Sequence, residues 1–361
     1  MTWNWQLPDW PNFTYEVKII ADMERQFLLQ VAPNSLLKNH HPQTYSQFMV
    51  DVLSQEGMES AKIEGELLCR ESLQSSIKKH FGLKTHAKEK AKETGMAEAL
   101  CDVYESFAMP LSHEMLWKWH FLLFKNETNE IELGKYRSHV EPMQIVSHRY
   151  GDPKVFFEAP PSERVFGEMQ RFIDWFNTKE SLTVVLEKAA VAHLYFENIH
   201  PFEDGNGRIG RLLIEKVLSQ GIGQPILIAV SKILEKRKKE YYAALECCNK
   251  TLQVDSWLLF FAEVVLQAEK DAEELLNHLI HKMKLMTMLK GTINERQEKV
   301  LLKMFQSGPE GFVGGLSAEK YIAITKASRA TATRDLAELV SLQALTKTGE
   351  LRHTRYWLYR T

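Results

Sequence analysis

Apolar residues recur at helical spacing along most of this chain. Between residues 44 and 68, for example, Phe48, Val52 and Met58 belong to a series whose members lie mostly three to six positions apart. Similar patterns predict further helices over residues 97–108, 112–125, 163–177, 184–197, 208–219, 231–248 and 255–287. Residues 1 to about 40, rich in Trp, Pro and Asn, are typical of an irregular strap packed by its aromatic rings, ahead of a helix from Tyr15. We therefore expect a mainly α-helical fold.

One segment departs from the helical pattern. Two short strand-like runs within residues 144–158 flank the turn residues Tyr150, Gly151, Asp152 and Pro153. Turn residues between apolar runs predict a β-hairpin.

The pattern changes again after residue 290. The segment KGTINERQ follows a long predicted helix, and helices are then expected over residues 295–306, 317–324 and 328–341. Two strand-like runs, ALTKTG and RYWLYR, come last. Three helices and a two-stranded ribbon predict a winged helix at the C-terminal end.

Composition and charge narrow the class of protein. A chain of 361 residues, 44% of them apolar, is long enough for two or three domains with cores of their own. Its formal net charge of -2 argues against a protein that coats nucleic acid or membranes, so any basic site must be local. The four cysteines lack metal-finger spacing, and the start MTWNWQLPDW lacks the basic and apolar regions expected of a signal peptide. The longest apolar stretch, 257–266, is interrupted by Glu263. We expect a soluble, cytoplasmic protein with reduced thiols.

Residues 200–211 read HPFEDGNGRIGR. The apolar run before them predicts a buried helix that stops at His200, because Pro201 cannot continue it. After the glycines, Ile209, Leu212 and neighbouring residues form the apolar face of a second helix. The motif is therefore expected to be a loop entering a helix N-terminus, where free N–H groups attract anions and glycines let a phosphate approach the backbone.

The side chains of this motif suit phosphate chemistry. Arg208 and Arg211 lie three positions apart, hence on one helix face, and both can reach the same polyphosphate. Asp204 offers a hard oxygen ligand suited to Mg²⁺, and His200 is placed to accept a proton from a hydroxyl. The alternative is a Gly-rich connector with a hydrogen-bonded histidine. A Gly-Lys-Ser/Thr ending is missing, which disfavours hydrolysis of the phosphate-loop type.

The string resembles the Fic motif, His-Pro-Phe-x-(Asp/Glu)-Gly-Asn-Gly-Arg-x-x-Arg, at every fixed position. Fic enzymes are α-helical, and most move AMP from ATP onto a protein hydroxyl. The resemblance implies that His200 is the general base, that Asp204 holds Mg²⁺ and that Phe202 anchors the loop. It also implies an ATP-binding run: Asn206 with the amides of Gly205 and Gly207 at the α-phosphate, Arg208 and Arg211 at the β- and γ-phosphates, and Ile209 and Gly210 within the same run.

Two further segments resemble parts of Fic domains. GKYR at 134–137 is similar to the family's entry to the flap, so the hairpin over 144–158 would be that flap and would hold a target segment as an added strand. KRKKEYYAAL is similar to the segment that closes over adenine and ribose, with Tyr241 and Tyr242 as stacking candidates and Arg237 as a polar contact. A solvated basic face beside a core tyrosine explains the same residues equally well.

SAKIEG at 60–65 resembles the family's inhibitory motif, Ser/Thr-x-x-x-Glu-Gly/Asn. Ser60 and Glu64 are four apart and share one face of the predicted helix, and Gly65 follows. A Glu64 carboxylate docked on Arg211 would occupy the guanidinium that orients the γ-phosphate. An ordinary surface glutamate is the alternative. The aromatic start, WNWQLPDWPNF, also resembles an uncharacterised domain found before some bacterial Fic domains.

The C-terminal segment is locally basic. From residue 295 on it has 11 Lys and Arg against 7 Asp and Glu, a balance of about +4. The polar Arg329, Thr331, Thr333 and Arg334 lie opposite an apolar face, as in a recognition helix, and KTGELRHTR would be the wing. Such residues fit phosphate contacts with DNA. Contacts with a second copy or with the target are the alternative use of this domain.

These features predict three domains: an N-terminal segment with the inhibitory helix (1–90), a Fic catalytic domain (91–290) and a winged-helix domain (291–361). The leading function is an autoinhibited protein adenylyltransferase that uses ATP and Mg²⁺, modifies a hydroxyl of a target protein or of itself, and releases pyrophosphate. Removal of AMP by the same fold and a nucleotide-sensing, DNA-binding regulator are the alternatives. A target docked on the flap is the expected partner, with a homodimer and DNA as further candidates and no membrane.

Overall fold

The computed structural model describes residues 2–16, 18–31, 41–85, 88–126, 131–146, 155–178, 185–308 and 311–359. The chain forms two compact units. The larger comprises Met1–Pro42 and Met49–Lys270, and the smaller comprises Gln43–Phe48 and Asp271–Thr361. The division falls within α12 (Asp255–Met288), which contributes to both units.

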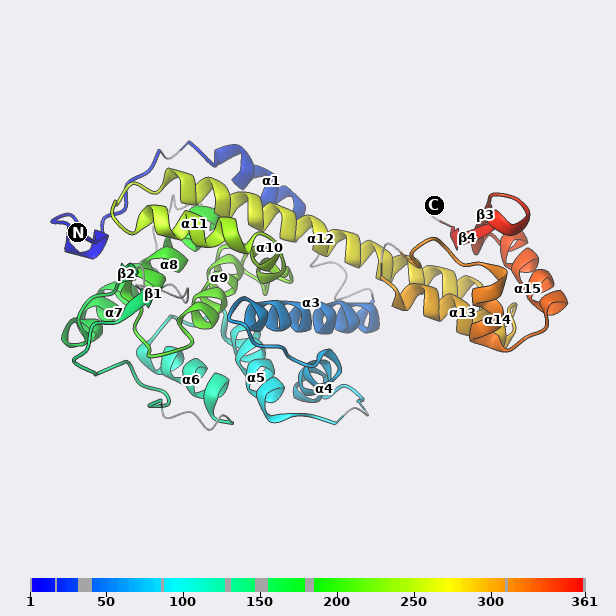
Figure 1. Ribbon diagram of the computed structural model, residues 1–361, viewed down its shortest axis with the longest axis horizontal. Helices are drawn as coiled ribbons and strands as arrows, with labels where there is room; N and C mark the ends of the chain where they lie inside the picture. The colour runs from blue at the N-terminus through cyan, green and yellow to red at the C-terminus, as the bar shows by residue number, and fades with distance from the viewer. Residues whose placement is uncertain are drawn as a thin grey trace. The chain divides into compact units, whose positions relative to one another are not determined.

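Helices dominate the larger unit (Figure 1). Besides the first part of α12, its helices are α1 (Ala21–Val31), α3 (Pro42–Ile63), α4 (Arg70–His80), α5 (Ala91–Ser106), α6 (His113–Phe124), α7 (Ser162–Asn177), α8 (Val185–Ile199), α9 (Asn206–Ile222), α10 (Val230–Lys236) and α11 (Lys238–Cys248). The most extensive packing is between α8 and α9, with α5 and α6 against α9 and α7 against α8. α8 is apolar on nearly every side, and nearly all of its residues are buried, as expected for a central core helix.

The predicted mainly α-helical fold is confirmed, and three details of the prediction are wrong. The first helix begins at Ala21 rather than at Tyr15, because the backbone on both sides of Tyr15 is held elsewhere: Thr14 forms a parallel bridge with Gln253, and the Glu16 N–H donates to Oδ1 of Asp255 at 2.7 Å. The run 231–248 is two helices, α10 and α11, which meet at Arg237, where the backbone leaves helical geometry. The short helix α4 was not predicted, because its mostly polar sequence gives little hydrophobic periodicity.

The predicted hairpin is present. β1 (Gln144–Val146) pairs antiparallel with β2 (Val155–Glu158), with Gln144 opposite Glu158 and Ile145 opposite Phe157. The predicted turn residues Tyr150, Gly151, Asp152 and Pro153 lie outside the described residues.

The smaller unit is a winged helix, as predicted. It contains α13 (Glu295–Gln306), α14 (Ala318–Thr325), α15 (Arg329–Ser341) and the antiparallel strands β3 (Leu345–Thr348) and β4 (Arg355–Leu358). The side chains of Asn294, Ser317 and Ser328 accept hydrogen bonds from the first turns of the three helices, which explains where these helices begin. Apolar residues of all five elements and of the end of α12 form one buried cluster.

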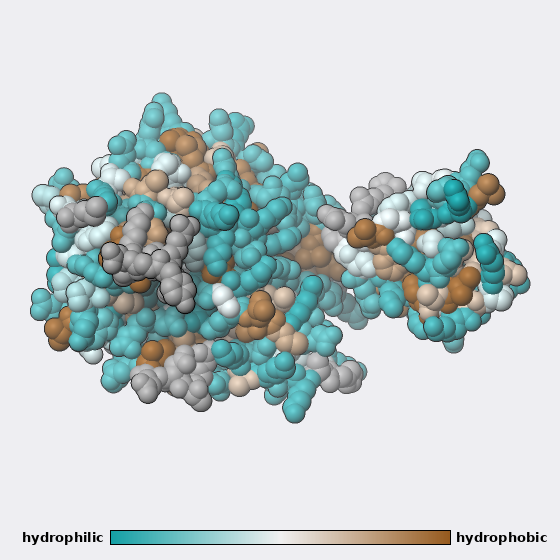
Figure 2. Space-filling model, viewed as in Figure 1, coloured by the Kyte–Doolittle hydropathy of each residue, from teal (hydrophilic) through white to brown (hydrophobic). Residues whose placement is uncertain are grey.

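The visible surface and the helices were compared with what a membrane span requires. The face of the molecule in Figure 2 is mostly hydrophilic, with scattered apolar patches. Among the described residues, no helix combines the length and the apolar character needed to cross a membrane. All four cysteines lie in the described part of the chain and are free thiols.

Candidate active site

The motif HPFEDGNGRIGR forms a tight loop between α8 and the N-terminus of α9. Gly205 is needed in this loop, because its φ is +82° and a Cβ there would lie 2.6 Å from the Phe124 ring. Phe202 is fully buried and stacks on His120 with ring centroids 4.4 Å apart. These contacts fix the loop against the core.

Asn206 closes the same loop. Its amide nitrogen donates to the Phe202 carbonyl at 2.8 Å, and its Oδ1 accepts from the Phe202 N–H at 2.9 Å. The Fic resemblance implies this side chain at the α-phosphate, but in the structure both of its polar atoms are engaged within the loop. The N–H groups of the first turn of α9, at 206–208, have no carbonyl within the helix to bond and are what this turn offers to an anion.

His200 has the geometry of a base. Its Nδ1 lies 3.3 Å from the Glu197 carbonyl oxygen, which can only accept, so Nδ1 carries the proton and Nε2 keeps a lone pair. Burial lowers the pKa of His200 to about 4. The imidazole is therefore neutral at pH 7 and can take a proton at Nε2.

Arg208 and Arg211 project from the first turns of α9 and are almost fully buried, at 3% and 2% exposed. Arg208 stacks over the Phe124 ring at 4.4 Å. Within the described part of the chain, Nε of Arg208 and Nη1 of Arg211 have no hydrogen-bond acceptor. Since buried guanidinium N–H groups are costly to leave unbonded, the pair is suited to an anionic ligand.

The predicted inhibitory residues meet Arg211. Ser60 Oγ accepts from Nε of Arg211 at 2.8 Å, and the Ser60 carbonyl accepts from Nη2 at 2.9 Å. Glu64 Oε1 accepts from the same Nη2 at 2.7 Å. Glu64 is the residue directly after the end of α3, and Gly65 follows with φ +85°, a conformation that favours glycine.

The Glu64 carboxylate also lies against the N-terminus of α9. A Cβ added to Gly207 would be 2.3 Å from Glu64 Oε1, so only glycine allows this approach. Burial by itself would raise the pKa of Glu64, but the charges of Arg211 and Arg208 outweigh burial and lower it. Glu64 is thus ionised at neutral pH and places a negative charge where a phosphate would bind.

Glu66 is a contact that sequence reasoning missed. Its Oε2 accepts from Nη1 of Arg208 at 3.2 Å, and it also lies 3.8 Å from Lys92. The segment after α3 therefore engages both arginines of the motif, Arg211 through Glu64 and Arg208 through Glu66. The inhibitory motif ends at Gly65, so nothing in it pointed to Glu66.

Glu197 is a second missed residue. Its Oε2 lies 3.9 Å from Nδ1 of His200, and burial together with the charge of Glu64 raises its pKa to about 8. Gly210 makes room for it, since a Cβ there would be 2.6 Å from Glu197 Oε1. A glutamate near the end of α8, where the helix carries no other charged side chain, was the available signal. Ile209, in the predicted ATP-binding run, is fully buried and anchors α9 in the core.

Asp204 is the predicted metal ligand of the loop. Its Oδ1 accepts from the Gly205 N–H, its Oδ2 lies 3.6 Å from Arg208, and its side chain is 56% exposed. Among the described residues there is no group of three or more His, Cys, Asp or Glu side chains that could hold a metal ion. One accessible carboxylate fits Mg²⁺, which takes its other ligands from water and phosphate.

The three candidates for adenine binding differ in burial and in their contacts. Tyr241 is 2% exposed and its hydroxyl lies 2.7 Å from Nε2 of His193, so in this conformation it packs in the core, and its stacking role stays a prediction. Arg237 pairs with Glu240 and Glu263. Tyr242 is 44% exposed, and burial and the nearby charge of Glu64 raise its pKa to about 12, so it remains a stacking candidate beside the site.

Arg137, the last residue of GKYR, connects the motif to the helix that follows the hairpin. Its Nε donates to the His200 carbonyl at 2.8 Å, and its Nη1 donates to Oγ of Ser162, the first residue of α7, at 3.0 Å. Its own N–H donates to the Pro201 carbonyl at 2.9 Å. Arg137 therefore connects the backbone of the motif to the start of α7, the helix that follows the hairpin.

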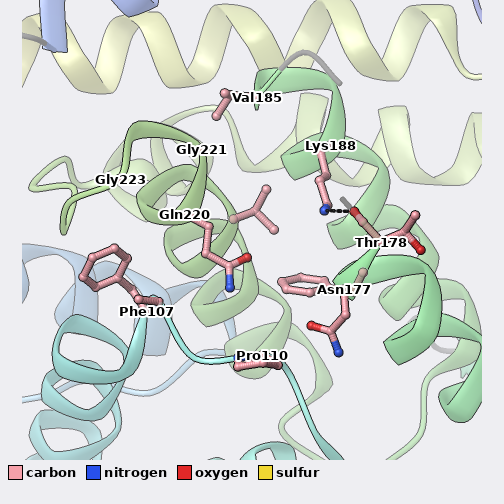
Figure 3. A pocket seen from close by; sticks show the side chains of 12 residues that line it. Phe107, Pro110, Asn177, Thr178, Val185, Lys188, Gln220, Gly221 and Gly223 are labelled. Carbon is pink, nitrogen blue, oxygen red and sulfur yellow. Dashed lines mark hydrogen bonds between the residues drawn. The ribbon is translucent and has the colours of Figure 1, made fainter. Parts of the chain in front are cut away.

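A separate cavity of about 490 Å³ lies away from the motif, between the start of α8 and the end of α9 (Figure 3). Its lining includes Phe107, Asn177, Lys188 and Gln220, and none of the described residues that line it is a histidine, a cysteine or a carboxylate. Lys188 donates to the Thr178 carbonyl at 3.3 Å. This lining has no acid–base pair, so the motif remains the candidate active site.

Comparison with protein families identifies two regions. Residues 110–218 match the model of the Fic/DOC family, and residues 3–83 match a domain of unknown function, DUF4172. The chain thus contains a Fic/DOC family domain with that domain ahead of it.

Curated relatives match over part of their length. A segment of 94 residues is 35% identical to protein adenylyltransferase fic-1 of Caenorhabditis elegans and covers 26% of this chain and 18% of that protein. A segment of 114 residues is 33% identical to protein adenylyltransferase Fic of Drosophila willistoni and covers 31% of this chain and 22% of that protein. The matched segments therefore span about a fifth of these relatives.

Solved structures share the fold. A Fic family protein from Desulfovibrio desulfuricans superposes with a TM-score of 0.57 at 20% identity, over 96% of this chain and 98% of that one. A Fic domain containing signaling protein from Bacteroides thetaiotaomicron superposes with a TM-score of 0.54 at 22% identity, over 72% of this chain and 95% of that one. The helical architecture with small hairpins is that of Fic family structures.

Proposed function

We propose that the Fic/DOC domain is the catalytic part of a protein adenylyltransferase, which transfers AMP from ATP to a hydroxyl side chain of a target protein or of the chain itself. The observation that carries the proposal is the buried pair Arg208 and Arg211, each with one N–H group that lacks an acceptor in the described part of the chain. Nucleotide phosphates would satisfy both groups. The partial matches to proteins named adenylyltransferases support the same activity.

In the proposed reaction, the target hydroxyl oxygen attacks the α-phosphorus of ATP. The bond from that phosphorus to the oxygen that bridges to the β-phosphate breaks, and pyrophosphate leaves. Nε2 of His200 takes the hydroxyl proton, a role open to an imidazole that is neutral at pH 7. The arginine pair and the first N–H groups of α9 stabilise the phosphate charge.

Asp204 is the residue that would hold Mg²⁺. Its exposed carboxylate beside Arg208 fits an ion whose other ligands are water and phosphate oxygens. When bound, Mg²⁺ supplies positive charge that neutralises the phosphates. Arg208, 3.6 Å from Asp204, helps to hold the same phosphates in register.

We further propose that the end of α3 holds the enzyme in an inhibited state. Glu64 occupies Arg211 and Glu66 occupies Arg208, so the two guanidinium groups are engaged by carboxylates of one segment. A carboxylate at the N-terminus of α9 competes with phosphate for the same N–H groups and the same charges. ATP in its reactive pose would require Glu64 to move.

The experiment that tests the transfer is labelling with ATP that carries the label on either the α- or the γ-phosphate, in the Glu64→Gly variant with Mg²⁺. We expect α-label and a mass increase of one AMP on a hydroxyl residue. Label from the γ-phosphate alone would move the protein to kinase-type chemistry and reject the proposal.

Removal of AMP from a modified target is the second candidate. The observation that favours it is the position of the ionised Glu64 carboxylate, whose charge acts on His200 as well as on Arg211. A carboxylate there can orient a water molecule towards a phosphorus atom. Release of AMP from a pre-modified protein by the unaltered enzyme, lost in Glu64→Gly, would favour this activity.

DNA binding by the winged helix is a separate candidate. Arg329, Thr333 and Arg334 are exposed on α15 with Thr331 partly so, and the two arginines make no ion pair with any described residue. Basic side chains on such a helix suit phosphate contacts. A gel-shift series in rising salt tests it, and binding that does not weaken in an Arg329→Ala, Arg334→Ala variant would reject this surface.

A further inference from the structure

The N-terminal segment Trp3–Trp5 lies against the strand β2 of the hairpin. Nε1 of Trp5 donates to the Glu158 carbonyl at 2.6 Å. The Trp3 ring meets the edge of Phe157 with centroids 5.5 Å apart. Both tryptophans are 7% exposed, so this is a packed contact. The segment Trp3–Trp5 belongs to the region that matches a domain of unknown function.

The bond from Trp5 is made on the outer edge of β2. The Ala159 N–H donates to the Met143 carbonyl at 2.9 Å, so these two residues form a hydrogen-bonded pair of the ladder. Gln144 and Glu158, the next pair, are then a non-hydrogen-bonded pair whose backbone groups point away from the hairpin. The Glu158 carbonyl is therefore an edge acceptor, and Trp5 occupies it.

A second edge acceptor of β2 is also occupied. Nδ2 of Asn249, the residue after α11, donates to the Phe156 carbonyl at 3.1 Å. The Asn249 carbonyl in turn accepts from the Asn4 N–H at 2.8 Å. Asn249 and Trp5 together close the outer edge of β2 to any added strand.

Asn4 connects the residues at the outer edge of β2 to the end of α8. Its fully buried side chain donates to Oδ1 of Asn198 and, at 2.9 Å, to the Cys248 carbonyl. Asn198 is two residues before His200. One short segment thus contacts β2, the end of α11 and the helix that carries the candidate base.

The other edge of the hairpin is accessible. Gln144 and Ile145 of β1 are exposed, and β1 has no strand partner besides β2 in the part of the chain that the structure describes. The backbone N–H and C=O of Gln144 point outward by the pairing argument above. Such an edge can accept an extended peptide as an added strand.

We propose that Trp3–Trp5 is a clamp that positions the flap: it closes the β2 edge, fixes the hairpin to α8, and leaves β1 as the open edge of the hairpin in the described part of the chain. This proposal does not rest on the proposed function, because it concerns only how the hairpin is held.

The clamp is tested by hydrogen–deuterium exchange of the full chain without nucleotide. In an Asn4→Ala, Trp5→Phe variant, the hairpin amides at 157 and 159 should exchange about tenfold faster or more, the effect of one or two lost hydrogen bonds, while those of α9 should not change. Trp10→Phe is the matched control, because it removes an indole donor of the same segment that bonds Glu168 on α7. Unchanged hairpin exchange in the first variant, or equal acceleration in the control, would overturn the clamp.

Discussion

Glu64→Gly should raise AMP transfer by about 10- to 150-fold over the unaltered protein. Glu64 Oε1 accepts from Arg211 at 2.7 Å, and the arginine is 2% exposed. The substitution removes this carboxylate but leaves both bonds from Arg211 to Ser60, so the guanidinium stays in place for the γ-phosphate. Since Glu64 follows the last residue of α3, a glycine there does not interrupt the helix.

The magnitude follows from the contact that is lost. A hydrogen bond between charged groups contributes about 1.5–3 kcal/mol, and each 1.4 kcal/mol or so is tenfold in the population of the open state. Glu66 bonds Arg208 at 3.2 Å, is 27% exposed and is shared with Lys92. An ion pair of this kind contributes at most about 1 kcal/mol, so Glu66→Gln should raise transfer by only about fivefold or less.

The assay is the initial rate of incorporation of α-labelled AMP, with ATP affinity and thermal unfolding measured on the same preparations. Arg211→Ala is the informative control. It should be inactive alone, and adding Glu64→Gly should not rescue it, because the released arginine is what activation uses.

Two results would refute the reasoning. One is a Glu64→Gly protein that stays folded and binds ATP but transfers no more AMP than the unaltered protein. The other is an Arg211→Ala, Glu64→Gly double variant as active as Glu64→Gly, which would mean that Glu64 acts through some other group.

Three further predictions concern buried groups. Burial raises the pKa of Glu56 from 4.5 to about 7. As the pH rises, this carboxyl ionises in the unfolded chain before it ionises in the folded protein, so the free energy of unfolding should fall by on the order of 3 kcal/mol between about pH 4.5 and 7. Glu56→Gln should remove that part of the fall when the free energy of unfolding is measured by urea titration at several pH values. Curves of stability against pH that run parallel for the two proteins would contradict this prediction. Because burial lowers the pKa of His200 to about 4, NMR titration of the ligand-free protein should show a neutral imidazole down to about pH 5. The signal of His200 is identified by its loss in His200→Ala. Protonation of this imidazole near pH 6.5 would contradict the prediction. Lys216 donates to three backbone carbonyls at and beyond the end of α5, so Lys216→Met should cost about 3 kcal/mol or more, and an unchanged melting temperature would count against it.

The candidate loop could be predicted almost residue by residue, because its geometry is local. Pro201 ends one helix, Gly205 supplies the turn, and three-residue spacing places Arg208 and Arg211 on one face of the next helix. Each of these constraints acts within a few residues along the chain. The winged helix was predictable for the same reason, since its helices begin at residues that accept hydrogen bonds from their own first turns.

The roles of Tyr241 and Tyr242 could not be predicted in this way. Adjacent residues on a helix point about 100° apart, so one of the two must face the core and the other outward. Which one is buried depends on His193, 48 positions away in the sequence, whose ring nitrogen lies 2.7 Å from the Tyr241 hydroxyl. The spacing of residues along α11 does not reveal that partner.

The contacts of the N-terminal region join residues that are even farther apart in the sequence. They bear on whether the region that matches a domain of unknown function is a separate domain. Asn4 and Asn198 are 194 positions apart, and Ser60 and Arg211 are 151 apart. Both contacts arise within residues 3–83, yet each ends on a helix that flanks the candidate loop, one on α8 just before His200 and the other on α9. A region whose buried polar groups are satisfied by the Fic/DOC domain would leave those groups unpaired if it folded alone. It is therefore better understood as part of one unit with the Fic/DOC domain, in which we propose that Trp3–Trp5 positions the flap and Ser60–Glu66 restrains the arginines, than as a separate module.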